Sequence, residues 1–228
     1  MKEKAIKILT EENAKAAIEF LKDQDDALLA ADNFNAVMRH AYWEMHDLDS
    51  TIMLAKEGIA YASAKAKETE DKGQAAELNN IVKAISYNLA SFTWPGWDED
   101  WIEDITPEYL KLGLDAAHSN LHLAIELDRG DLAISRAHWM LAAQQIASHK
   151  YQEARENFSK SIEYAEKAEA HSDVLLSHGF LHVVSLLENP EDEDARSSLE
   201  AIRSELVNLE HGEMLAQQMD DTLRVFGQ

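Results

Sequence analysis

Two pairs of histidines have the spacing with which imidazoles chelate a divalent metal ion. His118 and His122 lie four residues apart in a segment of helical periodicity, and so do His178 and His182. Residues four apart share one face of a helix, so each pair could supply two nitrogen ligands. Neither pair contains the glutamate of a His-Glu-x-x-His zinc site, and a third ligand would have to come from another helix. The simpler interpretation places the second pair in a core and the first on a partly exposed face, and no cofactor is expected.

The common catalytic signatures are missing from the sequence. It contains no cysteine, which excludes disulfides, thiol nucleophiles and thiolate metal sites. It has no Gly-x-Ser-x-Gly motif, no phosphate-binding glycine loop and no dinucleotide-binding fingerprint. Its carboxylates are so numerous that pairs occur by chance, so none can be selected as an acid–base dyad. We expect a protein that is not an enzyme. The alternative is a small-molecule or metal-dependent enzyme whose aromatic pocket is completed by His118, His122 or His138.

The net charge is strongly negative. Over 228 residues, 43 Asp and Glu stand against 21 Lys and Arg, which gives −22 with histidine neutral. Nucleic-acid binding needs cations that displace phosphate counterions, and anionic lipid headgroups would repel this chain. The charge therefore favours a basic or neutral partner over nucleic acid or membrane, besides promoting solubility. The N-terminal segment has no apolar signal-peptide core and no long apolar run follows, so a cytoplasmic location is expected.

Three of the five tryptophans lie within the eleven residues SFTWPGWDEDW, from Ser91 to Trp101. Pro and Gly interrupt regular structure, so the indoles of Trp94, Trp97 and Trp101 are expected at a loop after a helix. They could lie at one rim of a ligand-binding surface. Alternatively, Trp97 and Trp101 could fold back over a hydrophobic edge between helices, because an inserted loop must bury something to be ordered.

Apolar residues recur at intervals of three and four almost throughout, and only eight glycines and three prolines interrupt the chain. This pattern predicts an all-α protein with about ten to eleven helices, mostly in antiparallel pairs. Thr10, Thr106 and Ser172 are predicted N-caps, Asn189-Pro190 is predicted to start a helix, and Lys72-Gly73 is predicted to break one. The predicted helical segments are 2–22 (a pair), 26–45, 50–67, 75–93, 107–127, 132–148, 151–170, 173–187, 191–209 and 213–226.

Three predicted helices carry a bulky residue followed by a small one near their middle, at Leu89-Ala90, Leu141-Ala142 and His178-Gly179. The helix after the second of these has the spacing Ala154-x3-Phe158-x2-Ser161. Over about 135–168 this pattern resembles a tetratricopeptide repeat, in which a small residue on one helix receives a large residue of its antiparallel neighbour. The match is weaker over 84–118, degenerate over 172–205 and ambiguous in register over 33–62.

The resemblance implies one domain, 1–228, folded as a right-handed α–α superhelix of about four helical hairpins. The approximate hairpin units are 26–70, 75–127, 131–170 and 172–209, with terminal helices at 2–22 and 213–226. In that family the first helices of successive pairs line a concave face that binds peptides. The resemblance therefore implies a non-catalytic scaffold that binds a protein or peptide.

Carried over to this chain, the resemblance implies an aromatic groove with Arg136 near its middle. Aromatic and arginine side chains are enriched among binding hot spots. The implied groove residues are Trp43, Tyr87, Ser91, Trp94, Arg136, Trp139 and Phe180, with Trp97 and Trp101 on a flap at one rim. The same rings could instead form ordinary interhelical core. A third possibility is a structural homodimer in which the tryptophan loop or the last helix lies in the subunit interface.

Overall fold

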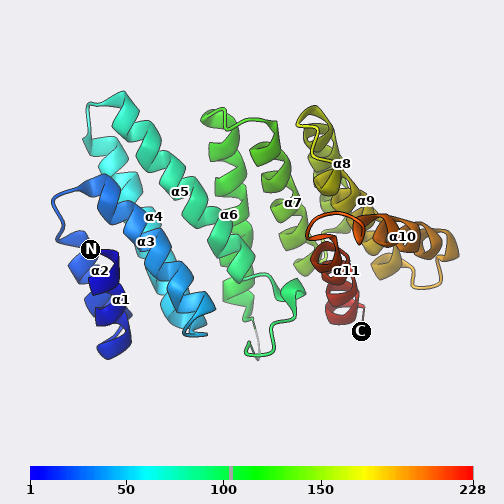
Figure 1. The fold of residues 1–228 in the computed structure, drawn as a ribbon, viewed down its shortest axis with the longest axis horizontal. Helices are drawn as coiled ribbons and strands as arrows, with labels where there is room; N and C mark the ends of the chain where they lie inside the picture. The colour runs from blue at the N-terminus through cyan, green and yellow to red at the C-terminus, as the bar shows by residue number, and fades with distance from the viewer. Residues whose placement is uncertain (103–104, 228) are drawn as a thin grey trace. The chain divides into compact units, whose positions relative to one another are not determined.

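The structure is a computed structural model that describes residues 1–102 and 105–227. Within these ranges it contains eleven α-helices, one short 3-10 helix and no β-strand (Figure 1), so the predicted all-α fold of consecutive helical hairpins is confirmed. None of the described helices is both long and apolar enough to span a bilayer. The contacts divide the chain into two compact units, unit 1 (Met1–Phe92) and unit 2 (Thr93–Gln228).

Unit 1 is built from five helices that share one core. They are α1 (Lys2–Glu11), α2 (Ala14–Lys22), α3 (Ala27–Trp43), α4 (Leu48–Glu68) and α5 (Lys72–Phe92). Helix α4 packs against both α3 and α5, which also contact each other, while α1 and α2 lie against α3. The absence of a side chain at Gly58 of α4 permits this packing. A Cβ there would lie 2.9 Å from Cβ of Phe34 on α3 and 3.0 Å from Cδ1 of Ile85 on α5.

Two helix boundaries of unit 1 differ from the prediction. Thr10 does not cap α2, because its hydroxyl donates to the carbonyl of Ile6 inside α1, and Asn13 accepts the capping bond instead. Lys72-Gly73 does not break a helix, because both residues belong to the first turn of α5. There the Asp71 carboxylate accepts from the backbone N–H of Gly73. At both helix starts the side chain of an Asn or Asp just before the helix, Asn13 for α2 and Asp71 for α5, accepts from free backbone amides of the first turn.

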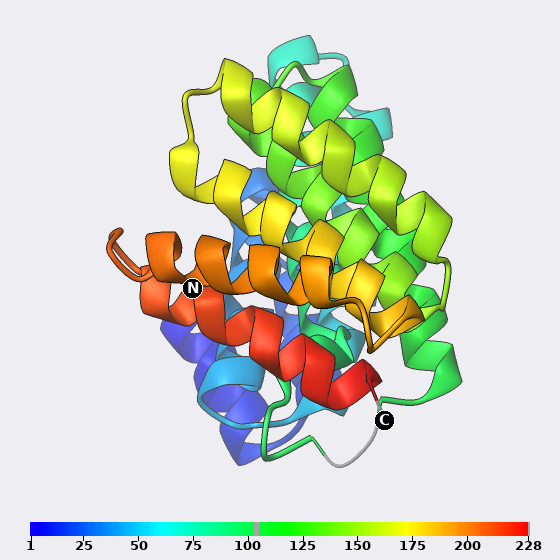
Figure 2. The ribbon, with the colours of Figure 1, turned by 90° about the vertical axis from the view of Figure 1, so that its right-hand side faces the viewer.

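Unit 2 begins with the loop that holds three tryptophans and continues through six helices. The loop includes the 3-10 helix η1 (Pro95–Trp97), and the helices are α6 (Pro107–Glu126), α7 (Asp131–Ala147), α8 (Tyr151–Lys167), α9 (His171–Glu188), α10 (Glu193–Leu206) and α11 (Gly212–Phe226). Each helix packs on the next, and α11 also packs on α9. Figure 2 shows α9, α10 and α11 side by side. A Cβ on Gly179 of α9 would overlap with Cε of Met219 on α11, so the glycine permits this close approach.

The repeat-like spacing of α8 corresponds to buried positions, since Ala154, Phe158 and Ser161 all lie in the core. Ser161 also belongs to a chain of three buried hydroxyls, which we call the serine chain. The hydroxyl of Ser135 on α7 donates to the Ser161 carbonyl at 2.8 Å, and Ser161 Oγ lies 2.9 Å from Oγ of Ser177 on α9. The serine chain therefore joins three successive helices through hydrogen bonds that water does not reach.

The helix starts of unit 2 confirm one predicted cap and contradict two. Thr106 caps α6, its hydroxyl accepting from the Tyr109 N–H at 3.2 Å, with Pro107 at the first helical position. Ser172 is not a cap, because α9 already begins at His171 and has no side-chain cap bond. Asn189-Pro190 does not open α10 either, since the Asp192 carboxylate accepts its capping bond.

Candidate binding site beside Trp94

Trp94 is inserted into the core of unit 2, where only 1% of its surface is exposed. Its ring meets Trp139 of α7 edge to face at 5.7 Å between centroids, and lies 6.2 Å from Phe180 of α9. Trp97 packs edge to face on Trp94 at 4.9 Å. We call Trp94, Trp97, Trp139, Phe158 and Phe180 the aromatic cluster. Through it, the loop is attached to the helices that follow it.

The sequence Pro95-Gly96-Trp97 forms the short helix that places these rings. Proline fixes the first backbone angle of η1, and Gly96 lies directly against the indole of Trp94. A Cβ on Gly96 would overlap with three atoms of that indole, so only glycine fits. Asp98 then adopts a left-handed conformation, with φ of 52°, and its N–H donates to the Pro95 carbonyl at 3.0 Å. The turn brings the Asp98 carboxylate to the surface beside Trp94.

The prediction that Trp94, Trp139 and Phe180 line an open groove is wrong. All three are buried, with Trp139 6% and Phe180 0% exposed. Their rings pack against one another because burying large aromatic surfaces edge to face is more favourable than leaving them in water. Trp97 is half-buried against Trp94 and Trp139, as the alternative of a loop that folds back predicts. Trp101 is also half-buried.

The other predicted groove residues are on the surface to different degrees. In unit 1, Trp43 is 53% exposed and packs edge to face on Tyr42, while Tyr87 and Ser91 are half-buried. In unit 2, Arg136 of α7 is exposed, and its Nε donates to Oδ1 of Asp173 on α9 at 2.8 Å.

The histidine pairs lie on two helices of unit 2. His118 and His122 are exposed on α6, as predicted, and His122 Nε2 lies 3.3 Å from a carboxylate oxygen of Glu126. His178 and His182 are half-buried on α9 and do not lie in the core as predicted, and burial lowers the pKa of His182. In the described part of the chain, no three His, Asp or Glu side chains lie together in a way that could hold a metal ion.

His138 is the third histidine that the alternative of an enzyme places at a pocket. It lies half-buried on α7, with Nδ1 2.8 Å from Oδ1 of Asn157 on α8, and its ring stacks on Tyr164. Burial lowers the pKa of His138, and the hydrogen bond with Asn157 offsets only part of this effect. His138 therefore serves the contact between α7 and α8.

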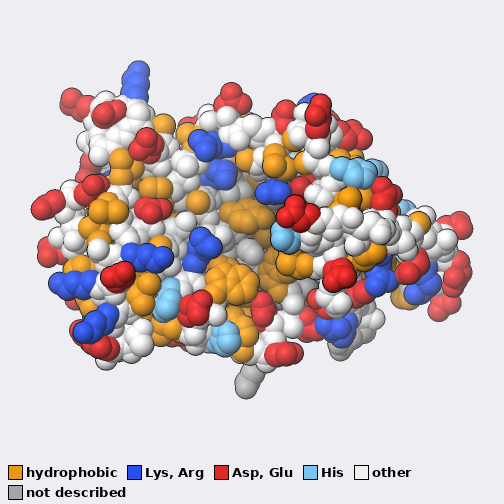
Figure 3. All heavy atoms as spheres, viewed as in Figure 1, with side chains coloured by type: hydrophobic (Ala, Val, Ile, Leu, Met, Phe, Trp, Pro, Cys, Tyr) orange, Lys and Arg blue, Asp and Glu red, His pale blue; other side chains and the backbone are white. Residues whose placement is uncertain are grey.

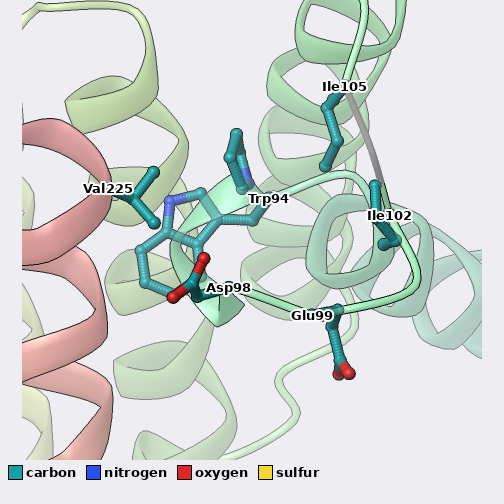
Figure 4. Close-up of a pocket in the computed structure, with 7 residues that line it drawn as sticks. Trp94, Asp98, Glu99, Ile102, Ile105 and Val225 are labelled. Carbon is teal, nitrogen blue, oxygen red and sulfur yellow. The ribbon is translucent and has the colours of Figure 1, made fainter.

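A cavity of about 180 Å³ lies beside Trp94, and we call it the Trp94 cavity. Figure 4 shows Val225 of α11 on one side of the indole and Ile102 and Ile105 of the loop on the other. Two acidic residues complete the lining, Asp98 exposed and Glu99 half-exposed, and Figure 4 shows the Asp98 carboxylate beside the indole and that of Glu99 directed away from it. The full lining consists of Trp94, Pro95, Asp98, Glu99, Ile102, Ile105 and Val225.

The two carboxylates of the Trp94 cavity differ in their partners. Asp98 Oδ2 accepts from Nε and Nη2 of Arg224 at 2.6 and 2.5 Å, and Nη2 also donates to Oδ1 of Asp221 at 2.6 Å. The hydrogen bond with Asp98 is the main reason that the pKa of Arg224 is raised. Glu99 forms no ion pair or side-chain hydrogen bond within the described residues. One negative charge at the cavity is therefore neutralised by α11 and the other is not.

Two indole nitrogens of the aromatic cluster are buried without a hydrogen-bond acceptor among the described residues. They are Nε1 of Trp94 and Nε1 of Trp139. A buried donor left unpaired costs about 1–3 kcal/mol, and this cost must be offset by the burial of the rings. Trp94, which lines the cavity, is therefore held in place by packing and not by its N–H.

The sequence pointed to Trp94 but not to the rest of the cavity. The sequence shows acidic residues after the Pro-Gly turn. Nothing in it marks Asp98 and Glu99 as site residues among the 41 other acidic residues. Arg224 and Val225 belong to α11, the last helix of the sequence. They lie beside the loop only because α11 packs on η1.

Comparisons with known proteins identify no relative: no protein-family model matches the chain, no curated protein matches it, and no solved structure matches it. The resemblance to tetratricopeptide arrays therefore stays a prediction.

Proposed function

We propose that this protein is a non-catalytic binding module for a basic segment of another protein, and that it holds one side chain of that segment in the Trp94 cavity. The observation that supports this most directly is the lining of the cavity, which combines apolar walls with two carboxylates. A cavity of about 150 Å³ is enough for benzene in a well-studied protein, so 180 Å³ can accept a single side chain.

The charge of the whole chain supports a basic partner. The net charge of −22 creates a negative potential that attracts cations and raises their association rate. Figure 3 shows Asp and Glu side chains spread over the visible face of the molecule. Glu99 then offers an incoming cation a carboxylate that no described side chain neutralises. The same negative potential repels nucleic acid and anionic membranes. The proposal also includes a cytoplasmic location.

The helical architecture adds support by analogy alone. Consecutive helical hairpins, with Ala154, Phe158 and Ser161 buried at the repeat-like spacing, are what the resemblance to tetratricopeptide arrays implies. Such arrays bind peptides, but a fold does not by itself assign a function. The proposal therefore moves the site from the predicted groove to the Trp94 cavity and keeps the predicted class of partner.

Tryptophan side-chain resonances give a direct test, because the chain has only five. We would titrate the ¹⁵N-labelled full chain with the peptide GKGRGKGR and follow the indole N–H signals. The signals of Trp94 and Trp97 should shift while that of Trp43, in unit 1, should not. Glu99→Gln should weaken binding by about fivefold, the equivalent of about 1 kcal/mol for one exposed charge contact.

Glu210→Gln is the matched control, because it removes the same charge from a side chain that is 91% exposed. It should leave the affinity within about twofold of the wild type. A second control is the peptide GQGQGQGQ, which should not bind. If this neutral peptide binds equally, or if Glu99→Gln behaves like Glu210→Gln, the Trp94 cavity is not the site.

A further inference from the structure

We infer that the side chain bound at the Trp94 cavity is an arginine, and that Arg224 of this chain occupies the Asp98 contact until the partner's arginine displaces it. This inference rests on the proposed function. It adds that the site prefers arginine and that Arg224 of the same chain competes with the partner for Asp98. It is carried by the geometry of three residues, Asp98, Arg224 and Asp221.

Asp98 already binds a guanidinium in the structure. Two nitrogens of Arg224, Nε and Nη2, converge on Asp98 Oδ2 at 2.6 and 2.5 Å. Asp98 has a left-handed backbone conformation, and its carboxylate is held by the bond with Arg224. A guanidinium offers several N–H groups in a planar fork, whereas an ammonium is a compact point charge. A carboxylate placed for the first group is therefore expected to favour arginine over lysine.

The contact between Arg224 and Asp98 is suited to exchange. The side chains are 57% and 39% exposed, and ion pairs as exposed as this one are worth little because water and salt screen them. Arg224 also keeps a second carboxylate, since its Nη2 donates to Asp221 Oδ1 at 2.6 Å. When Arg224 releases Asp98, its positive charge therefore still has a carboxylate partner in Asp221.

The cavity provides room for the rest of the incoming side chain. Val225, the neighbour of Arg224, lines it together with Ile102 and Ile105 (Figure 4). The three methylene groups of an arginine can lie along these aliphatic walls, as the stems of long charged side chains commonly do. Its guanidinium would then contact Asp98, with Glu99 as a second acidic residue of the cavity lining. Arg224 reaches Asp98 from α11, so a partner's arginine that lies in the cavity approaches Asp98 from a different element and competes for the same carboxylate.

The test compares three fluorescein-labelled peptides, GRGRGRG, GKGKGKG and the same peptide with citrulline at each basic position. Citrulline has nearly the shape of arginine and no charge. Binding to the full chain would be measured by fluorescence anisotropy at about 0.05 M salt, where exposed charge contacts are screened least. The arginine peptide should bind about threefold to tenfold more tightly than the lysine peptide, and the citrulline peptide should not bind.

The variants test the competitor. Arg224→Gln should bind the arginine peptide about threefold to fivefold more tightly than the wild type, because Asp98 no longer has a partner from α11. Arg224→Lys keeps the positive charge but loses the planar guanidinium. Its affinity for the arginine peptide should lie between those of the wild type and Arg224→Gln. Arg129→Gln is the control, since it removes the same charge from an exposed residue of the turn between α6 and α7. It should change the affinity by less than about twofold. Far-UV circular dichroism would verify that α11 stays folded in each variant.

The outcomes separate this inference from the proposed function. If wild type binds the arginine peptide but Arg224→Gln binds no better than Arg129→Gln, the displacement is overturned and the binding module stands. If the lysine peptide binds as tightly as the arginine peptide, the assignment of arginine is overturned. If none of the peptides binds any of the folded variants, the proposed function fails, and the inference fails with it.

Discussion

Trp139 of α7 and Phe180 of α9 meet edge to face inside unit 2, with their ring centroids 5.0 Å apart. Trp94 packs on both of them, and Phe158 of α8 lies 5.3 Å from Phe180. The loop and three helices therefore share the aromatic cluster. Substitutions within the cluster are expected to change the stability of unit 2 first and the affinity for a partner only as a consequence.

Trp139→Ala should lower the free energy of unfolding by about 3–5 kcal/mol, because it removes a buried ring and leaves a cavity. Trp43→Ala is the matched comparison, since it removes the same side chain from a position that is 53% exposed. Its cost should stay near 1 kcal/mol, corresponding to partial contact with Tyr42 and Phe92. Urea denaturation followed by circular dichroism measures both. Equal losses would contradict the assignment of Trp139 to the core.

Gly96→Ala should destabilise unit 2 by about 1–3 kcal/mol, because the added methyl group overlaps with the rigid and buried indole of Trp94. The shift of Trp94 should also weaken binding of the basic peptide. Gly73→Ala is the control, since the nearest atom to its new Cβ is an oxygen of Asp71 at 3.2 Å. In the first turn of α5, it should be neutral or stabilising by up to about 1 kcal/mol. Thermal unfolding of both variants gives the comparison, and a Gly96→Ala protein that melts like wild type would refute the close packing.

His138 should make stability depend on pH near neutrality. Burial lowers its pKa in the folded state, so the unfolded chain binds a proton more readily. The stabilising contribution is therefore complete above the ordinary histidine pKa of about 6.5 and is lost as the pH falls through the folded value. Urea midpoints between about pH 5 and 8 should show a smaller loss on acidification for His138→Gln than for wild type. His118→Gln, on the exposed face of α6, should follow the wild type.

Glu163 should titrate with a pKa of about 2, because hydrogen bonds from Lys160 and then from Lys167 stabilise its carboxylate. Since this value lies below that of the unfolded chain, the associated stability is present above about pH 4.3 and is lost as the pH falls toward 2. Carboxyl ¹³C NMR measures the pKa directly. Lys160→Met should raise it, whereas Lys111→Met, on α6, should not. A Glu163 pKa at the ordinary value would show that the two lysines are screened by water.

The all-α fold was predictable because apolar periodicity is repeated along the entire chain and does not depend on any single residue. Helix starts were predictable only where one strong candidate stood alone, as at Thr106. At α2 and α10 several Asn, Asp, Ser and Thr residues lie close together, and each type can cap a helix. The structure uses Asn13 instead of Thr10 and Asp192 instead of Asn189, and the local sequence does not distinguish between these candidates.

The site was predictable only in part, for a related reason. An aromatic residue on an inner helix has the same spacing whether it faces an open groove or a neighbouring helix. The sequence therefore could not show that Trp139 and Phe180 would be covered by Trp94. The contact between Asp98 and Arg224 joins residues 126 positions apart, and neither lies in a motif.

The serine chain has a consequence for how the helices of unit 2 can slide. Helix faces that are rich in alanine have few protruding side chains. Apolar packing alone therefore only weakly opposes a shift of one helix along another. A slide of one turn, about 5.4 Å, would separate Ser135, Ser161 and Ser177 and leave their hydroxyls unpaired in a dry environment. The hydrogen bonds of these three serines thus fix the lengthwise register of α7, α8 and α9. The same register keeps in place the aromatic rings that support the loop.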